Sequence, residues 1–162
     1  MTNLTVPLII GVISDTHGQL RPEALAALAD CDHILHAGDV GDPDILYALD
    51  AIAPVTAIRG NTDTLGPCAD LPATAPVILG GRFFYLIHNL NDLDLSPESA
   101  KIACVVSGHT HRPEIRTHRG VLYLNPGSCG PRRFQLPATI ARVIIRPEPH
   151  SELQAEIIQL LD

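Results

Sequence analysis

The sequence has no tryptophan, only 4% aromatic residues and few basic side chains. Its 11 Lys and Arg residues are outnumbered by 18 Asp and Glu residues, which gives a formal net charge of -7. Proteins that bind duplex nucleic acid or anionic lipid need a basic surface. We therefore expect neither a membrane nor a long nucleic acid as a partner, whereas a small anionic substrate fits if metal ions supply positive charge.

Cysteine pairs and long apolar runs are also missing. The four cysteines are widely separated and form no C-x-x-C motif, which argues against a zinc finger and against a disulfide scaffold. The start of the chain has no basic segment followed by a full apolar segment and a small-residue cleavage site. The longest apolar runs are far shorter than a membrane span. These absences predict free thiols and a cytoplasmic location.

Aliphatic residues are abundant instead. Apolar residues make up 46% of the chain, which suits a core of β-branched strands and Ala/Leu helices. A chain of 162 residues can bury roughly two thirds of its unfolded surface. We expect one domain that spans residues 1–162.

The first half of the chain alternates apolar runs with segments of helical spacing. Strands are predicted at 8–13, 32–36 and 55–58, and helices at 22–29 and 43–50. Strands that alternate with helices form a parallel sheet, and the ligands of such a sheet gather beyond the carboxyl ends of its strands. Potential ligands follow each of these strands, and they are Asp15, His17, Asp39 and Asn61.

The second half of the chain reads as strands and turns. A loop is predicted over 64–76, and a helix start at 96–98. Two-residue connections predict tight hairpins. The predicted strands are 77–79 with 82–87, 102–106, 114–117 with 121–124, and a closing antiparallel pair at 139–145 and 153–160.

Three histidines follow strands of the second half. His88 ends the strand at 82–87, and His109 and His111 follow the apolar run 102–106. Side chains two residues apart point the same way in extended chain, so His109 and His111 can face one metal cluster. A surface loop that happens to hold two histidines is the alternative for this fragment alone.

Seven donors at the ends of separate strands exceed what a structural zinc site needs. Carboxylates, imidazoles and an amide without thiolate suit Mn, Fe, Zn, Co or Ni. Asp39 is central in the order and is the natural bridge between two cations, which at about 3.5–4 Å apart can hold a hydroxide nucleophile. The predicted metal ligands are Asp15, His17, Asp39, Asn61, His88, His109 and His111.

Each donor also has an ordinary structural role to be weighed. Asp15 and Asn61 can cap helices, and His88 can be a hydrogen-bonded core histidine. His36 lies outside the ligand set, and we expect it to be structural.

The ordered blocks Asp15-Thr16-His17, Gly38-Asp39, Gly60-Asn61-Thr62-Asp63, His88 and Gly108-His109-Thr110-His111 resemble those of the calcineurin-like metallophosphoesterases. The short chain and the later Asn125-Pro126-Gly127-Ser128 are most similar to the compact bacterial and archaeal phosphodiesterase branch, which is related to the retromer subunit Vps29. This resemblance implies an α/β fold, a four-layer α/β/β/α sandwich with mixed sheets.

The resemblance also implies how the ligands divide. One metal takes Asp15, His17, Asp39 and His111, and the other takes Asp39, Asn61, His88 and His109. Asp63 is expected to orient His109 or a nearby ligand, and Asn125 and Ser128 to shape the turn behind the site.

Two positions depart from the family pattern. Many members have a histidine, thought to assist the leaving group, where this chain has Thr62. A threonine hydroxyl is no general acid near neutral pH, so poor alkoxide leaving groups should react slowly. The second departure is Asn89, where the family usually has glycine after the histidine.

The sequence thus predicts a two-metal phosphoesterase, with manganese favoured, that hydrolyses small phosphodiesters through a metal-bridging hydroxide. The expected catalytic residues are Asp39, Asn61 and His109, and the expected substrate contacts are Asn61, Thr62 and Arg132. The alternatives are a non-catalytic scaffold like Vps29, or a phosphomonoesterase or nuclease on the same fold. Self-association into a homo-oligomer is a further alternative.

Overall fold

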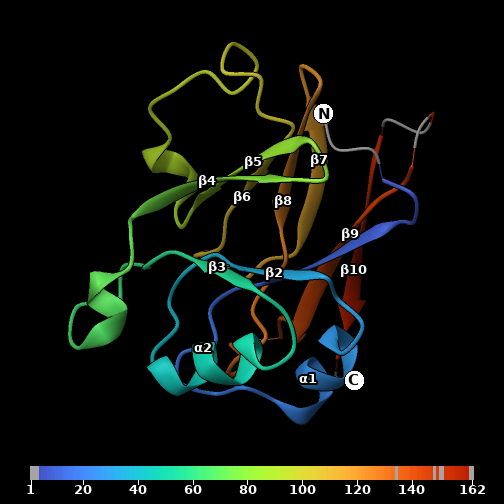
Figure 1. Ribbon diagram of the computed structural model, residues 1–162. Helices are drawn as coiled ribbons and strands as arrows, with labels where there is room; N and C mark the ends of the chain where they lie inside the picture. Colours follow the sequence, from blue (N-terminus) through green and yellow to red (C-terminus); the bar gives the residue numbers. More distant parts are fainter. Residues whose placement is uncertain (1–3, 134, 148, 150–151, 161–162) are drawn as a thin grey trace.

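Two five-stranded sheets pack face to face in the computed structural model of this chain (Figure 1), which describes residues 4–133, 135–147, 149 and 152–160. The first sheet has the order β10-β9-β1-β2-β3 and the second has the order β4-β5-β6-β8-β7. Both sheets are mixed, so the predicted α/β class is confirmed.

The first sheet begins as a parallel unit, as predicted. Its parallel strands are β1 (Leu8–Ile13), β2 (His33–His36) and β3 (Val55–Ala57). The strands β9 (Thr139–Ile145) and β10 (Leu153–Gln159) extend it, with β9 antiparallel to both β1 and β10. The predicted closing antiparallel pair is confirmed.

The helices α1 (Pro22–Leu28) and α2 (Pro43–Asp50) cover the outer face of this sheet, below it in Figure 1. Each helix has proline at its start, where the missing N–H costs no hydrogen bond. Asp42 caps α2 because its side chain accepts from the backbone N–H of Asp44. The predicted helices are confirmed, and the bounds of α2 match the prediction.

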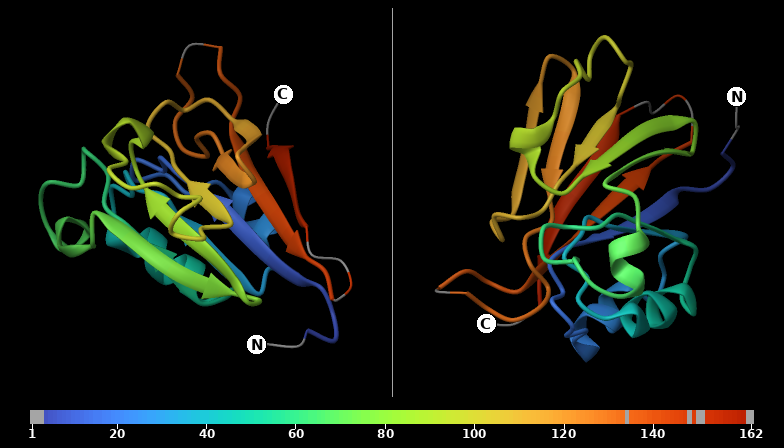
Figure 2. Two further views of the ribbon diagram at one scale, coloured as in Figure 1. Left: turned by 90° about the horizontal axis from the view of Figure 1, so that it is seen from above. Right: turned by 90° about the vertical axis from the view of Figure 1, so that its left-hand side faces the viewer.

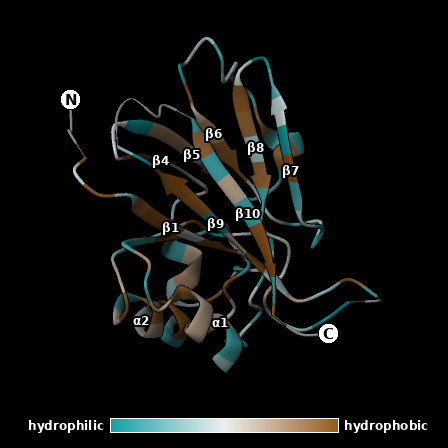
Figure 3. Cartoon of the chain, turned by 90° about the vertical axis from the view of Figure 1, so that its right-hand side faces the viewer, coloured by the Kyte–Doolittle hydropathy of each residue, from teal (hydrophilic) through white to brown (hydrophobic). Residues whose placement is uncertain are grey.

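The central strand β1 is buried on both of its faces. Val12 packs into the apolar cluster between the sheets, whereas Ile13 packs into the cluster beneath the helices. This double burial explains the continuous apolar run without alternation. Figure 3 shows the hydrophobic colour along β1 and β9, and hydrophilic colour on much of the exposed edge strand β7.

The second sheet contains β4 (Thr74–Leu79), β5 (Arg82–Ile87), β6 (Cys104–Val106), β7 (Glu114–His118) and β8 (Val121–Asn125). The two predicted hairpins are β4–β5 and β7–β8, while β5, β6 and β8 run parallel. The predicted loop over 64–76 is wrong at its end, because β4 already starts at Thr74 and includes Pro76. Proline is tolerated there since β4 is an edge strand. The same region contains a short 3-10 helix, η1 (Pro67–Asp70).

The outer face of the second sheet is covered by the segment 89–102 rather than by an α-helix. This segment contains the 3-10 helix η2 (Leu90–Asp92) and a turn at 97–101. The helix start predicted at 96–98 is therefore wrong: one turn forms, and Lys101 with φ 60° ends it. Leu90, Leu93 and Leu95 pack against the sheet, so the fourth layer of the predicted sandwich is present in this form (Figure 2).

Among the described residues, no helix is long and apolar enough to cross a membrane.

Candidate metal centre

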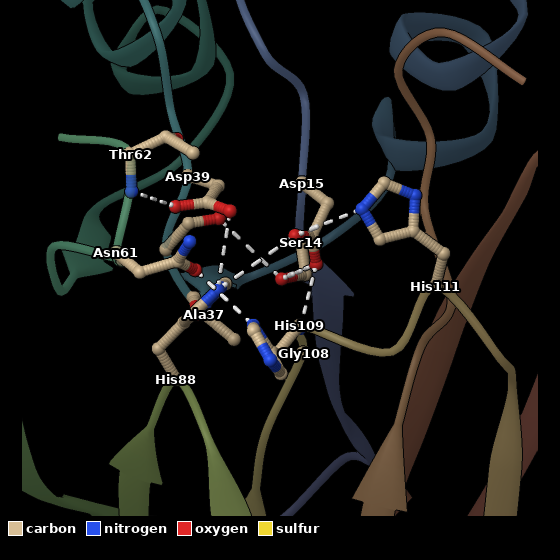
Figure 4. A network of polar contacts seen from close by, with 12 residues as sticks. Ser14, Asp15, Ala37, Asp39, Asn61, Thr62, His88, Gly108, His109 and His111 are labelled. Carbon is tan, nitrogen blue, oxygen red and sulfur yellow. Dashed lines mark hydrogen bonds and ion pairs between the residues drawn. The ribbon is translucent and has the colours of Figure 1, made fainter. Parts of the chain in front are cut away.

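All seven predicted ligands follow the carboxyl ends of parallel strands, where the two sheets meet. Figure 4 labels all of them except His17. The first sheet supplies four of them and the second sheet supplies three. In chain order, Asp15 and His17 follow β1, Asp39 follows β2, Asn61 follows β3, His88 follows β5, and His109 and His111 follow β6.

One half of the centre is formed by Asp15, His17 and His111. Asp15 Oδ1 lies 3.3 Å from His111 Nε2 and 3.6 Å from His17 Nε2. The two Nε2 atoms of the histidines are 3.4 Å apart. Nitrogen and oxygen donors that converge in this way are the arrangement expected around one cation.

The other half is formed by Asp15, Asp39 and His88. His88 Nε2 lies 3.2 Å from Asp39 Oδ2 and 3.8 Å from Asp15 Oδ1. Asp39 Oδ2 is also 3.7 Å from His17 Nε2. Asp39 thus reaches both halves, as expected of a bridge, and Asp15 reaches both as well.

Asn61 and His109 lie at the exposed side of the second half. His109 Nδ1 is 3.1 Å from Asn61 Oδ1, and the His109 ring lies edge-on to the His88 ring, with centroids 5.3 Å apart. Both residues are exposed, so they lie on the solvent side of the centre.

Two atoms that face the centre are buried without a hydrogen-bond partner among the described residues, Asp15 Oδ1 and His88 Nε2. Both side chains are at least 95% buried. A buried polar atom without a partner is costly, and a bound cation would satisfy both atoms. The donor set therefore fits divalent metal ions.

The remaining atoms of these side chains are held by hydrogen bonds that aim the free atoms at the centre. Asp15 Oδ2 accepts from the Ser14 hydroxyl at 2.6 Å and from the His109 amide at 3.1 Å. Asp39 Oδ1 accepts from the Thr62 amide at 2.9 Å. His88 Nδ1 lies 2.7 Å from the Ala37 carbonyl, to which it must donate, so Nε2 carries the lone pair of the neutral ring.

The electrostatics of the centre favour positive charge. Burial alone would raise the pKa of Asp15, but the His111 and His17 rings and the Ser14 hydroxyl hold that pKa far below its usual range. Burial likewise opposes ionisation of Asp39, yet His88 and the Thr62 amide lower its pKa. The pKa of His88 is raised by Asp39, the Ala37 carbonyl and Asp15, against the effect of burial. Asp15 and Asp39 are therefore held as carboxylates, the charge state in which they can bind a cation.

Five of the seven candidate ligands have left-handed backbone, with φ between 46° and 73°. They are Asp15, His17, Asp39, His109 and His111. Residues with a Cβ adopt this conformation at a cost of about 1–3 kcal/mol each, and such strain concentrates at functional sites. The turns after β1, β2 and β6 therefore place the candidate ligands at a cost in backbone conformational energy.

Two glycines make room for the carboxylates. A Cβ on Gly108 would overlap the Ser14 hydroxyl and lie 2.6 Å from Asp15 Oδ2. A Cβ on Gly60 would lie 2.5 Å from the Asp39 amide nitrogen and overlap the Asp39 carboxylate. These motif glycines are required by close approach of the neighbouring turn.

Asp63 was expected to orient His109 or a nearby ligand, and its contacts are with the turns that carry Asp39 and Asn61 rather than with His109. Its carboxylate instead accepts three backbone N–H groups, from Val40, Gly41 and Gly60 at 2.9–3.1 Å. Asp63 therefore joins the turn after β2 to the turn after β3.

Asn125 and Ser128 lie behind the centre, as expected. Asn125 donates to the Gly108 carbonyl at 3.0 Å, and the Ser128 hydroxyl donates to the Asp15 carbonyl at 2.9 Å. Both side chains support the turns that carry ligands.

His36 is fully buried, as expected for a structural histidine. Its Nδ1 accepts from the Gly38 amide at 3.1 Å, and its Nε2 lies 3.0 Å from the Thr16 hydroxyl. Because that hydroxyl donates to the Val40 carbonyl, it accepts from Nε2. Burial lowers the pKa of His36 to about 4, so the ring is a neutral connection between the turns after β1 and β2.

The two expected substrate contacts outside the ligand set are both exposed. Thr62 follows Asn61 directly and borders the centre through its bond to Asp39. Arg132 donates to the Leu136 carbonyl at 3.3 Å, within its own loop. The four cysteines are buried and free, and burial raises the thiol pKa of Cys31 to about 11 and of Cys129 to about 12, so these thiols are inert.

Sequence reasoning missed two hollows beside His109. The larger hollow, about 410 Å³, includes Asn61, His88, Asn89 and His109 in its lining. The smaller hollow, about 170 Å³, shares Asn89 and His109 with it and extends to Tyr123. Motif residues such as Asn61 and His109 form one side of these hollows, whereas Tyr85, Asp92 and Tyr123 on the other sides belong to no motif.

The comparisons with known proteins agree with this geometry. Residues 8–147 match the model of the calcineurin-like phosphoesterase superfamily domain. A probable metallophosphoesterase of Methanothermobacter thermautotrophicus is 35% identical over 164 residues, covering 94% of this chain and 92% of that protein.

Two solved structures share the fold. One, described as a novel archaeal phosphodiesterase, has a TM-score of 0.74 and 23% identity, covering 93% of this chain and 100% of the other. Vacuolar protein sorting 29 of Cryptosporidium parvum has a TM-score of 0.75 and 17% identity, covering 95% and 99%. The ordered motifs, the two mixed sheets and the matching domain model lead to one assignment: this chain belongs to the calcineurin-like phosphoesterase superfamily.

Proposed function

We propose that this chain is a metal-dependent phosphoesterase that hydrolyses small phosphodiesters with two divalent cations. The single observation that carries the proposal is the convergence of oxygen and nitrogen donors from Asp15, His17, Asp39, His88 and His111 in two groups that share Asp15, with Asp15 Oδ1 and His88 Nε2 buried and unpartnered among the described residues. When bound, two cations supply an activated water and positive charge for the phosphoryl oxygens.

The protein's own residues position these parts. Asp15, His17, Asp39 and His111 hold one cation in this proposal, and Asp39, Asn61, His88 and His109 hold the other. Asn61 and His109 border solvent and, with Asp39, are the proposed catalytic residues. Asn61 and Thr62 are the proposed contacts to the phosphate, together with Arg132 from the nearby loop.

Thr62 provides no side-chain general acid, so the reaction depends on a leaving group that departs without protonation by this position. The hollows favour diesters over monoesters. A diester has two ester groups, and two hollows flank His109 to receive them. A monoester would fill only one.

The acidic chain and the donor set suggest the remaining properties. Carboxylate, imidazole and amide donors without thiolate suit manganese, with Fe, Ni, Co and Zn as alternatives. A net charge of -7 disfavours long nucleic acids and membranes as partners. We further propose a cytoplasmic protein whose main partner is a small phosphate ester, with self-association left to measurement.

The test is hydrolysis of bis(p-nitrophenyl) phosphate with added Mn²⁺, beside p-nitrophenyl phosphate as the monoester. We expect faster hydrolysis of the diester, and loss of activity by at least 10²-fold in Asp39→Asn with unchanged circular dichroism. His118→Ala, which removes an exposed histidine of β7, is the matched control and should keep its activity. Metal analysis that finds only trace binding at saturating Mn²⁺ would overturn the proposal.

A non-catalytic scaffold on the same fold is the competing hypothesis. The complete ligand set, including His17 and His88, favours catalysis over this role. Two bound metals without turnover of any mono- or diester substrate would favour the scaffold instead. Faster hydrolysis of monoesters or of short single strands would point to a phosphomonoesterase or nuclease.

A further inference from the structure

The larger hollow carries negative charge that no ion pair neutralises. Asp92 in η2 and Asp94 just after it line this hollow, and both side chains are exposed. Neither makes an ion pair with another described residue. Arg59 lines the hollow too, but its Nη1 donates to the Leu71 carbonyl at 2.6 Å. Two carboxylates and one guanidinium leave a net negative lining.

An aromatic ring stands in the same lining. Tyr85 of β5 is half-buried and borders the hollow beside Ile87. Quaternary and other ammonium groups are recognised by aromatic faces, which attract cations through the ring quadrupole. Carboxylates near such a ring add Coulomb attraction.

The smaller hollow differs in charge. Glu114 and Arg116 form an ion pair at 2.9 Å, and the Arg116 guanidinium lies 4.4 Å from the centroid of the Tyr123 ring. Its charges and its aromatic face are therefore already engaged within the protein. The two sides of His109 are chemically unequal.

The larger hollow opens onto the metal centre itself. Its lining includes Asn61, His109 and His88, whose unpartnered Nε2 is buried. An ester group attached to a phosphate at the centre would therefore extend toward Tyr85, Asp92 and Asp94.

We propose that the larger hollow selects a phosphodiester whose ester group carries an ammonium or other cationic centre, and rejects an ester group that carries a second anion. This inference rests on the proposed function for the position of the phosphate. It narrows the substrate class to esters of cationic amino alcohols, with esters of anionic alcohols and chains of phosphates disfavoured.

The kinetic test uses three p-nitrophenyl phosphodiesters that differ in charge. Their second alcohols are choline, its uncharged isostere 3,3-dimethylbutanol, and the anionic 2-sulfoethanol. Each charge pair across water changes a rate or binding constant by roughly two- to threefold at low salt. We expect kcat/KM for the choline ester to exceed that for the sulfoethyl ester by about tenfold.

Matched variants separate local from overall charge. In Asp92→Asn/Asp94→Asn, the choline-to-sulfoethyl ratio should fall to about one or below, because the Arg59 guanidinium is then the charged side chain left in the lining. In Asp44→Asn/Asp50→Asn, which removes two carboxylates from α2, the wild-type ratio should be kept. Equal values for the three esters in the wild type would overturn the inference.

A binding measurement keeps the inference independent of turnover. Choline alone should shift the backbone amide NMR signals of residues 89–94 in the wild type and not in Asp92→Asn/Asp94→Asn. 3,3-Dimethylbutanol should shift them less. If no ester is hydrolysed but choline still binds there, the proposed function fails and the selectivity stands; if choline causes no shift at 89–94, the selectivity fails.

Discussion

At the scale of single residues, the centre depends on which atom of each side chain is left free. Asp15 engages one carboxylate oxygen with the Ser14 hydroxyl and the His109 amide, and leaves the other without a hydrogen bond. His88 does the same with its two ring nitrogens. Hydrogen-bonding partners of this kind fix the orientation of a ligand and tune its basicity.

The first prediction concerns Gly108. In Gly108→Ala, the new Cβ overlaps Ser14 and crowds Asp15, so the carboxylate must shift away from the centre. We expect metal affinity to fall by about 10–100-fold, measured by Mn²⁺ titration calorimetry. Ser14→Ala loses the hydrogen bond without crowding and should lose less. Unchanged affinity in Gly108→Ala would show that the turn can move to accommodate the Cβ without displacing the Asp15 carboxylate.

The second prediction concerns His36 and acid. Burial holds its pKa at about 4 when folded, against about 6.5 when unfolded. The unfolded chain therefore takes up the proton first, so this contribution to stability is complete above pH 6.5 and is lost as the pH falls to 4. The loss amounts to about 3 kcal/mol.

Urea unfolding in the presence of a chelator at pH 7.5 and pH 4 measures this loss. Other acid-sensitive groups affect wild type and variant alike, so the comparison is with His36→Gln, whose side chain does not titrate. We expect the wild type to lose about 3 kcal/mol more than the variant over this range. Equal losses would mean that His36 is protonated in the folded protein.

At the scale of elements, most strands could be predicted from the sequence, and so could the turns that bring the candidate ligands together. The left-handed backbone of those turns could not be predicted. β1 was predicted with correct bounds because its residues are apolar on both faces. The left-handed turns at Asp15 and Asp39 carry no glycine at the strained position, so nothing in the sequence marks them. The three backbone partners of Asp63 could not be predicted, because adjacency to a motif does not show which backbone groups a carboxylate meets.

The remaining errors have similar causes. The Pro, Gly and Ala residues of 64–76 predicted a loop, yet β4 begins within it, because an edge strand tolerates the missing N–H of Pro76 on its unpaired side. Ser96-Pro97-Glu98 has the signature of a helix start, but only one turn follows before Lys101. The linings of the two hollows include side chains of β5, β8 and η2. These elements are far from one another in the sequence, so no local pattern predicts that they meet.

The third prediction separates the turns after β5 and β6. His88 contributes to the half shared with Asp39, and His111 to the half shared with His17. We expect His88→Ala and His111→Ala each to retain one Mn²⁺ per chain, and the double variant none, by elemental analysis after gel filtration. His118→Ala should retain two. Loss of both ions from either single variant would mean that the halves do not bind independently.

At the scale of the whole molecule, bound metals would join the two sheets. Four candidate ligands follow strands of the first sheet and three follow strands of the second. The inter-sheet core, with Val12, Phe84 and Leu124, packs without such a connection. Cations at the centre would therefore add a connection between the sheets at the end of the sandwich that carries the Asp15 and Asp39 carboxylates and His88 Nε2.

The last prediction follows from this link. A cation that binds only the folded chain stabilises it by about 2.7 kcal/mol at a hundredfold excess over Kd, which for a chain of this size raises Tm by roughly 5–10 °C per site. Thermal unfolding with Mn²⁺ and with a chelator measures the shift.

Amide hydrogen exchange should slow at the turns after both β1 and β5, because each sheet supplies ligands to the same ions. Asp39→Asn removes a carboxylate that lies near His88 of one half and His17 of the other and should lose most of the shift, whereas His118→Ala should keep it. Slower exchange at the turns of one sheet alone would show that the ions bind without joining the sheets, since a shared ion must restrain both of its sides.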